Sequence, residues 1–352
     1  MRVKMESLLL KALKRTNTSR PPVWFMRQAG RYHSHYQSIR EKQSFVDLCK
    51  IPSLSAEVAL GPVMEFGFDA AILFSDILFT LEAMGFGLDY ENTGPKLSWQ
   101  LRQKADLKHI EASASASAKL DFQGEAIKAL RKSLPEDKAV IGFSGAPLTL
   151  FVYAVQGRHV PPLSEVEEGL KDGRFEGFCE PLIGILAESL AVQARSGADV
   201  ITLFDTSAGD ITFESYKQKV IPALTGVVER FRVQHDTPII YYSKGTDHRH
   251  FDLLSDINID CIGVDHRQNV KVLLEKYRNR FSVQGNFDQN LLLLPENEFD
   301  EKLTQYLSFI GTIPTELRRG YICGLGHGVL PKTPQRNVKK FIESVHNFFE
   351  KQ

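Results

Sequence analysis

Short apolar runs alternate with longer amphipathic stretches along almost the whole chain. The short runs are continuous and rich in Ile, Val and Phe, which is typical of parallel strands covered on both faces. We predict strands at residues 70–74, 140–143, 200–204, 239–242, 262–264, 281–283 and 321–323, with a weaker candidate at 23–25. Helix-period patterns lie between them at residues 54–66, 182–194, 213–233, 270–277 and 336–349. Pro62 and Pro222 fall inside two of these patterns, so each is expected to kink or split its helix.

Repeated alternation of strand and helix favours a parallel sheet, and about eight strands favour a closed (β/α)8 TIM barrel. We therefore predict an α/β fold with one barrel domain over residues 1–352 and an N-terminal helical and loop extension. An open doubly wound sheet is the alternative, because periodicity alone does not exclude it. Residues 112–118 alternate Ala and Ser, which predicts a short solvent-facing helix or a loop.

Composition narrows the classes of protein to consider. The chain has 352 residues, of which 43% are hydrophobic, and this is ample for a large core. Its 43 basic and 43 acidic residues balance, which argues against nucleic acid or an anionic membrane surface as a partner. No apolar run is long enough for a membrane span, and the run at residues 8–10 is too short for a signal peptide. Four scattered cysteines predict a reduced, cytoplasmic protein with free thiols.

A local basic cluster stands out in this neutral chain. Residues 20–42 hold five basic side chains and one acidic one. Arg27 and Arg31 directly follow an apolar stretch that should be buried, and arginine belongs in water unless an anion meets it. A pair of surface arginines is the alternative, but Gly30 disfavours a helix, where like charges four residues apart would also repel. The cluster therefore indicates a site for a multiply charged organic acid.

Polar residues also follow several predicted strands. Asp76, Thr206 and His327 come shortly after the strands at 70–74, 200–204 and 321–323, and Asn286 follows the strand at 281–283. In a parallel barrel the C-terminal ends of the strands meet at one face, where sites are built. We therefore expect these side chains to converge.

Each of these residues has an ordinary structural alternative. Asp76 precedes a helix pattern at residues 77–84 that stops at Gly85, so it could be only an N-cap. An Asp76→Asn substitution separates the two roles, because Asn caps well but carries no charge. Thr206 and Ser207 could likewise be caps.

His327 lies among three alternating glycines in residues 324–328. Glycine often marks a close approach of backbone to a ligand, although a hydrogen-bonded core histidine is the alternative. The spacing is not a dinucleotide-binding fingerprint, because Val329 stands where the last glycine would be needed. Tyr153 could simply be a packed aromatic residue.

Several catalytic and metal-binding motifs are missing from the sequence. There is no His-x-Cys pair, which argues against a thiolate zinc site. There is also no Walker loop, no His-Glu-x-x-His and no Gly-x-Ser-x-Gly. The run at residues 247–250 is interpreted as a solvated helix start, because His248 and His250 do not share a helix face.

Six ordered motifs resemble those of the uroporphyrinogen decarboxylase family. They lie at residues 24–32, 72–78, 142–147, 203–206, 284–286 and 325–328. The resemblance implies a (β/α)8 barrel, usually a homodimer, and a carboxy-lyase that needs no metal or organic cofactor. It implies conversion of uroporphyrinogen III to coproporphyrinogen III on the route to haem, by loss of carbon dioxide from four acetate side chains.

The resemblance also assigns roles to residues of this chain. Asp76 would bind the central pyrrole N–H groups and act in catalysis, with Arg27 as a candidate proton donor, although a substrate carboxyl or a water could serve instead. The segment from Arg27 to Arg31 would bind substrate carboxylates, and Arg40 stands where the family has another carboxylate-facing arginine. The substrate-binding residues that the resemblance implies are Arg27, Gln28, Ala29, Gly30, Arg31, Arg40, Asp76, Tyr153, Thr206 and His327.

The chain departs from the family pattern at three places. Residues 33–35 read His-Ser-His where the family usually has Leu-Pro-Glu, His266 replaces an aromatic residue, and Gln289 stands where proline is common. Two other functions are considered. A corrinoid methyltransferase would need zinc to activate a thiol, and the missing His-x-Cys pair speaks against it. A non-catalytic tetrapyrrole carrier would not need Asp76 beside an arginine pair.

Overall fold

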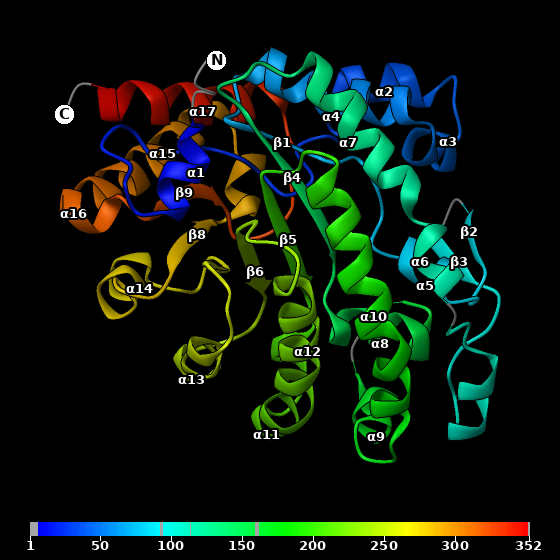
Figure 1. Ribbon diagram of the computed structural model, residues 1–352. Coiled ribbons are helices and arrows are strands. Elements are labelled where there is room, and N and C mark those ends of the chain that lie inside the picture. The colour runs from blue at the N-terminus through cyan, green and yellow to red at the C-terminus, as the bar shows by residue number, and fades with distance from the viewer. Residues whose placement is uncertain (1–5, 92–93, 113, 159–161, 351–352) are drawn as a thin grey trace.

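A parallel sheet of seven strands forms the centre of the molecule, in the order β1-β4-β5-β6-β7-β8-β9. The computed structural model describes residues 6–91, 94–112, 114–158 and 162–350. The strands lie in the middle and the helices surround them (Figure 1). Each of the seven main predicted strands is present. They are β1 (Ala70–Ile72), β4 (Ala139–Gly145), β5 (Val200–Asp205), β6 (Ile239–Ser243), β7 (Cys261–Gly263), β8 (Ser282–Phe287) and β9 (Tyr321–Leu325).

The segment around Val23 joins the two edges of this sheet. Val23 forms a parallel bridge with Cys323 of β9, where the Cys323 N–H donates to the carbonyl of Pro22 at 2.9 Å. On its other side, the carbonyl of Val23 accepts from the N–H of Asp69, directly before β1, at 2.9 Å. The weak strand predicted at residues 23–25 is therefore reduced to a single bridge, and a full eighth strand is not confirmed. Because both edges meet this segment, the sheet closes as in a TIM barrel, unlike an open doubly wound sheet.

Asp69 fastens this closure through its side chain. Its carboxylate accepts two hydrogen bonds from Arg20 at 2.6 and 2.8 Å and one from the N–H of Val23 at 2.8 Å. Burial acts to raise the pKa of Asp69, but Arg20, His346 and Lys138 outweigh it and hold that pKa well below its usual range. Only 3% of the side chain is exposed, so the N-terminal segment is held by a buried ion pair.

Helices before β1 form the predicted N-terminal extension, and the five predicted helix regions correspond to α4, α10, α11–α12, α14 and α17. The helix α10 begins well before residue 182. The α-helices of the described residues are α1 (Leu8–Leu13), α2 (Ser34–Arg40), α3 (Phe45–Lys50), α4 (Pro52–Phe66), α5 (Phe79–Ala83), α6 (Ala114–Ala118), α7 (Asp121–Ser133), α8 (Pro147–Gln156), α9 (Ser164–Gly169), α10 (Arg174–Arg195), α11 (Phe213–Ser215), α12 (Ile221–Arg232), α13 (His248–Leu253), α14 (Val270–Lys276), α15 (Glu296–Gly311), α16 (Thr315–Arg318) and α17 (Gln335–Glu350).

The two internal prolines have different consequences. The helix α4 continues through Pro62 without a break. The helix predicted at residues 213–233 is instead divided, because a π-helical turn, Tyr216–Val220, separates α11 from α12, and Pro222 lies in the first turn of α12. Proline removes a backbone donor, and the wider π turn accommodates that loss. The predicted split therefore occurs at Pro222 and not at Pro62.

Some elements were not predicted. The helix α7 buries Gln123, Ala126, Ile127 and Leu130 at helical spacing, a pattern that the sequence already contains. A two-stranded hairpin, β2 (Leu88–Glu91) and β3 (Gly94–Leu97), follows α5. Within the alternating Ala-Ser stretch, residue 113 lies outside the described residues and residues 114–118 form α6. Ala116 is fully buried, so the expectation of a solvent-facing segment was wrong at that position.

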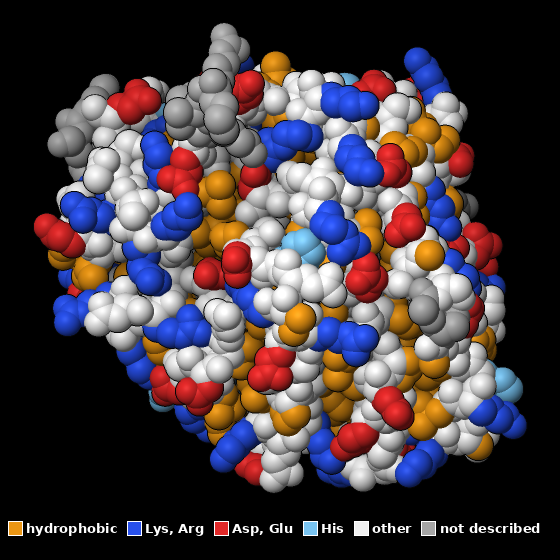
Figure 2. Space-filling view, viewed as in Figure 1, with side chains coloured by type: hydrophobic (Ala, Val, Ile, Leu, Met, Phe, Trp, Pro, Cys, Tyr) orange, Lys and Arg blue, Asp and Glu red, His pale blue; other side chains and the backbone are white. Residues whose placement is uncertain are grey.

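The hydrophobic core is continuous through the barrel. One cluster of buried side chains includes residues from Leu9 to Phe349. All four cysteines are buried and free. Side chains of both charge signs are interspersed over the visible face (Figure 2). Within the described part of the chain, no helix combines the length and apolar character that a bilayer crossing needs.

Candidate active site

Asp76 lies in the turn between β1 and α5. Its Oδ1 accepts a hydrogen bond from the N–H of Leu78 at 2.9 Å, which is an Asx-type turn. The N-cap position of α5 is Leu78, so Asp76 shapes the turn but is not the N-cap itself. Burial raises the pKa of the Asp76 carboxyl above its usual value. The groups that act in the opposite direction are the Leu78 N–H, the Tyr90 hydroxyl and the Arg27 guanidinium.

The turn that carries Arg27 is pinned to the first strand by Gln28. The Gln28 side chain is 1% exposed, and its Nε2 donates to the carbonyl of Ala70 at 2.9 Å. Its Oε1 accepts from the N–H of Phe25 at 3.3 Å, and its carbonyl accepts from the Tyr32 hydroxyl at 2.7 Å. Arg27 itself has a φ of 59°, in the left-handed region. No helix forms here, so the two arginines do not repel each other along one helix face.

Arg27 lies beside several of the other predicted site residues. Its exposed side chain packs over Gly328, where a Cβ would stand 2.7 Å from Arg27 Cδ. Burial raises the pKa of Asp76, Tyr153 and Tyr242, and the Arg27 guanidinium acts electrostatically against that rise at each of them. This turn, the end of β1, α8 and the loop after β9 therefore meet around Arg27.

Thr206 is held at the end of β5 by a buried network. Its N–H donates to Thr149 Oγ1 at 2.9 Å, and that hydroxyl donates to Asp205 Oδ1 at 2.9 Å. The Tyr241 hydroxyl donates to Asp205 Oδ2 at 2.7 Å. Burial raises the pKa of Asp205 to about 6 in spite of these donors. Ser207 makes no side-chain cap to the 3-10 turn that follows, so the predicted alternative of a cap is not observed there.

His327 is partly exposed in the loop after β9. The glycines around it make room for protein atoms. A Cβ at Gly324 would stand 2.9 Å from the Trp24 carbonyl oxygen, and one at Gly326 would stand 2.4 Å from the His266 nitrogen. These glycines were expected to let a ligand approach, but in the structure they let the loops pack closely against each other. This packing positions His327 beside the Arg27 turn.

Asn286 lies near the C-terminal end of β8, but its side chain is bound within the fold. It lies within β8, is 7% exposed, and its Nδ2 donates to the carbonyls of Asp265 at 3.0 Å and Gln268 at 2.6 Å. Its amide therefore ties the loop after β7 to β8, and its two Nδ2 hydrogen bonds are made to backbone carbonyls.

The remaining predicted residues lie on the segment from Ala29 to Arg40. Ala29 and Gly30 are half-buried backbone positions of the turn, while Arg31 and Arg40 are exposed. Burial raises the pKa of Tyr36 on α2, and both arginines act against that rise. Nη1 of Arg40 donates to the carbonyl of Gln43 at 2.8 Å. Two arginines thus stand near Tyr36, and a third stands near Asp76.

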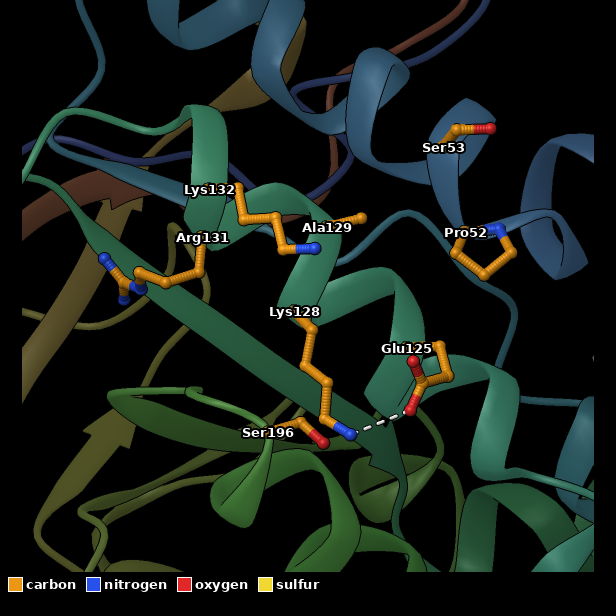
Figure 3. A pocket seen from close by; sticks show the side chains of 8 residues that line it. All are labelled: Pro52, Ser53, Glu125, Lys128, Ala129, Arg131, Lys132 and Ser196. Carbon is orange, nitrogen blue, oxygen red and sulfur yellow. Dashed lines mark hydrogen bonds and ion pairs between the residues drawn. The ribbon is translucent and has the colours of Figure 1, made fainter.

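A separate surface groove of about 650 Å³ lies between α4 and α7 (Figure 3). Two of its three basic residues are already paired, since Lys128 contacts Glu125 at 2.8 Å and Arg131 contacts Asp199. None of the predicted site residues lines it. Its lining residues are Pro52, Ser53, Glu125, Lys128, Ala129, Arg131, Lys132 and Ser196.

Comparison with known proteins identifies the family. A model of the uroporphyrinogen decarboxylase (URO-D) family matches residues 4–348. The chain belongs to this family. A uroporphyrinogen decarboxylase of Koribacter versatilis is 34% identical over 346 residues, which are 97% of this chain and 96% of the relative. One of Carboxydothermus hydrogenoformans is 35% identical over 347 residues, again 97% and 96% of the two chains. The chain is therefore a carboxy-lyase of the uroporphyrinogen decarboxylase family.

Solved structures agree on the fold. A methyltransferase from Methanosarcina mazei has a TM-score of 0.75 and covers 97% of this chain and 99% of its own, at 19% identity. A putative vitamin-B12-independent methionine synthase from Listeria monocytogenes has a TM-score of 0.55 at 12% identity, with 95% and 96% covered. At these identities the likeness concerns the barrel alone.

Residues 33–35, which read His-Ser-His where the uroporphyrinogen decarboxylase family usually has Leu-Pro-Glu, lie where α2 packs on α4. His33 is fully buried, and its Nε2 lies 2.7 Å from Glu65 Oε2. Burial lowers the pKa of His33. The ring of His35 lies over Gly61, where a Cβ would stand 2.3 Å from His35 Cδ2. The helix α2 begins directly after His33, so the altered residues start this helix without disturbing the Arg27 turn.

Two tyrosines near the predicted site residues, Tyr242 and Tyr90, were not predicted from the sequence. Tyr242 donates to the carbonyl of Gly326 at 2.8 Å, beside His327. Tyr90 on the β2–β3 hairpin faces Asp76. Both are ordinary strand tyrosines in the sequence, so nothing in their local pattern marks them.

Proposed function

We propose that this chain removes carbon dioxide from the four acetate side chains of uroporphyrinogen III, giving coproporphyrinogen III, without a metal or an organic cofactor. Decarboxylation of uroporphyrinogen in haem biosynthesis is the activity of the family to which the chain belongs. The observation that carries the proposal is the placement of Asp76, a desolvated carboxylate, beside the Arg27 guanidinium at the end of β1.

Decarboxylation needs an electron sink, because loss of carbon dioxide from an acetate otherwise leaves a carbanion. A pyrrole that is protonated at the ring carbon bearing the acetate becomes such a sink and carries positive charge. Asp76 accepts hydrogen bonds from the pyrrole N–H groups and stabilises that charge. A single preorganised group of this kind contributes about 3–4 kcal/mol to transition-state stabilisation.

The arginines hold the acid side chains of the substrate. A guanidinium grips a carboxylate at two points, and Arg27, Arg31 and Arg40 all present exposed side chains. Holding the carboxylates places one acetate at a time near Asp76. Gln28 contributes by fixing the turn, since its amide is used within the fold, and Ala29 and Gly30 keep the backbone open to the substrate.

Three further side chains complete the site in this proposal. Tyr153 on α8, Thr206 after β5 and His327 after β9 line the substrate around the Arg27–Asp76 pair. Arg27 is the cation next to the reacting acetate, but a guanidinium is a very weak acid. Its protonating role therefore requires that water or a substrate carboxyl resupplies the proton.

The proposal also covers the partners, the location and the oligomeric state of the protein. We propose that the substrate is a small molecule and that neither nucleic acid nor a membrane is a partner. We also propose that the enzyme is cytoplasmic and that it is a homodimer, as the family resemblance implies. Balanced charge and four free, buried thiols support this assignment.

An anaerobic assay tests the proposal. Purified protein is given uroporphyrinogen III in excess chelator, and the products are separated by chromatography. We expect stepwise loss of four carboxyl groups and accumulation of coproporphyrinogen III. Absence of that product, tight binding without turnover, or activity that chelator abolishes and zinc restores would contradict the proposal.

A further inference from the structure

The β2–β3 hairpin presents one tyrosine to the active site. Side chains of β2 alternate, so Leu88 and Tyr90 are half-buried on one face while Asp89 and Glu91 are exposed on the other. The hairpin is packed against α5, and the ring of Tyr90 lies 4.7 Å from that of Phe45 and 6.1 Å from that of Phe79, between ring centroids. These contacts fix where its hydroxyl points.

The Tyr90 hydroxyl oxygen is buried and makes no well-aligned hydrogen bond to any residue that the structure describes, although the Asp76 carboxylate is near enough to interact with it. Leaving a buried polar group without a partner costs about 1–3 kcal/mol. A packing role alone would be served equally well by phenylalanine. The hydroxyl at this position therefore calls for an acceptor that engages it in the working enzyme.

Asp76 is the carboxylate that this hydroxyl faces. Burial and then the Asp76 charge raise the pKa of Tyr90, so the phenol stays protonated and can only be a neutral donor towards that carboxylate. In return the hydroxyl acts against the burial that raises the pKa of Asp76. The other titratable groups around the pair are Arg27 on the turn, Cys49 on α3, Glu82 on α5 and Tyr153 on α8.

We propose that Tyr90 is a positioning residue of the decarboxylase, whose O–H donates to the Asp76 carboxylate and keeps it ionised and oriented towards the substrate. This rests on the proposed role of Asp76. The Leu78 N–H already holds Oδ1 at 2.9 Å. A second donor from the hairpin restrains the carboxylate from another direction without adding a charge, so Asp76 keeps its full negative charge for the cationic pyrrole.

The test is the pH dependence of kcat/KM in Tyr90→Phe, measured anaerobically with uroporphyrinogen. A hydrogen bond to a charged group corresponds to one pKa unit or more, so we expect the acid limb to move to higher pH by about one unit. Activity on that limb then falls about tenfold, while the plateau changes little. Tyr90→Met, which also lacks the hydroxyl but fills the site differently, should move the limb by the same amount.

Tyr277→Phe is the matched control, because the hydroxyl of Tyr277, directly after α14, donates to the carboxylate of Asp252 on α13 at 2.7 Å, away from the site. Its acid limb should coincide with that of the parent. The inference is overturned if the Tyr90→Phe limb also coincides with the parent, or if only Tyr90→Met shifts, which would indicate packing. Thermal unfolding of each variant verifies folding, and inactivity of the parent would instead contradict the proposed function itself.

Discussion

Asp76 combines a local structural role with a chemical one in a single side chain. Its Oδ1 shapes the turn before α5 by accepting from Leu78, while its charge lies beside Arg27. Asparagine keeps an acceptor oxygen for the turn but loses the charge. Asp76→Asn should therefore still bind uroporphyrinogen within about tenfold, and its kcat should fall by about 10²–10³, as for other single electrostatic stabilisers. Anaerobic turnover and equilibrium binding measure the two effects separately.

Asp288→Asn is the control for this substitution. Asp288 makes the same type of turn after β8, where its Oδ1 accepts from the N–H of Asn290 at 2.9 Å. We expect its kcat to stay near that of the parent. Near-normal turnover of Asp76→Asn would mean that Asp76 serves only the turn.

At the scale of elements, the site depends on how the Arg27 turn fits against the loop after β9. The N–H of Val329 donates to the carbonyl of Met26 at 2.9 Å, and the Arg27 side chain lies over Gly328. The positions of these two segments are thereby coupled. A change in the loop after β9 should therefore change the position of the Arg27 guanidinium.

Gly328→Ala tests this coupling. The new Cβ would stand 2.7 Å from Arg27 Cδ, and the flexible side chain would move aside. We expect KM to rise about tenfold, which corresponds to about 1.4 kcal/mol of binding, with a smaller change in kcat. Steady-state kinetics measure both constants.

Gly184→Ala in α10 is a matched glycine control, because its Cβ would meet only Arg230, at 3.6 Å or more. Alanine also favours the helix. Its kinetic constants should match those of the parent, and an unchanged KM in Gly328→Ala would contradict the coupling of loop and turn.

At the scale of the whole molecule, the buried carboxylate of Asp205 makes stability depend on pH. Its pKa is raised to about 6, against about 3.9 in the unfolded chain, so the folded state binds a proton more tightly. Its contribution to stability is complete below pH 4 and is lost as the pH rises through 6. The loss is about 3 kcal/mol.

Asp205→Asn removes this titration. Other groups titrate equally in both proteins, so the difference in their unfolding free energies isolates Asp205. We expect the parent to lose about 3 kcal/mol relative to the variant between pH 4 and pH 7, as measured by denaturant unfolding at a series of pH values. A pH-independent difference would show that Asp205 does not change its protonation in this range.

Much of the fold could be predicted because its signals are local. The apolar runs of the parallel strands are continuous, and seven of them became strands. The helix α7 carries an equally local signal in Gln123, Ala126, Ile127 and Leu130. By contrast, the segment around Val23 was only a weaker candidate strand, and its place between β9 and β1 comes from pairing partners far away in the sequence.

The sequence by itself determined the α/β class, the family, and the presence of the Arg27 turn and of Asp76, because charge, glycine positions and apolar periodicity belong to individual residues and short segments. Only the tertiary structure decided which polar groups meet. Burial and hydrogen-bond partners are properties of the packed chain. In the packed chain the Asn286 amide bonds the carbonyl of Asp265, and Tyr90 lies near Asp76. The same packing left the Tyr90 hydroxyl oxygen buried.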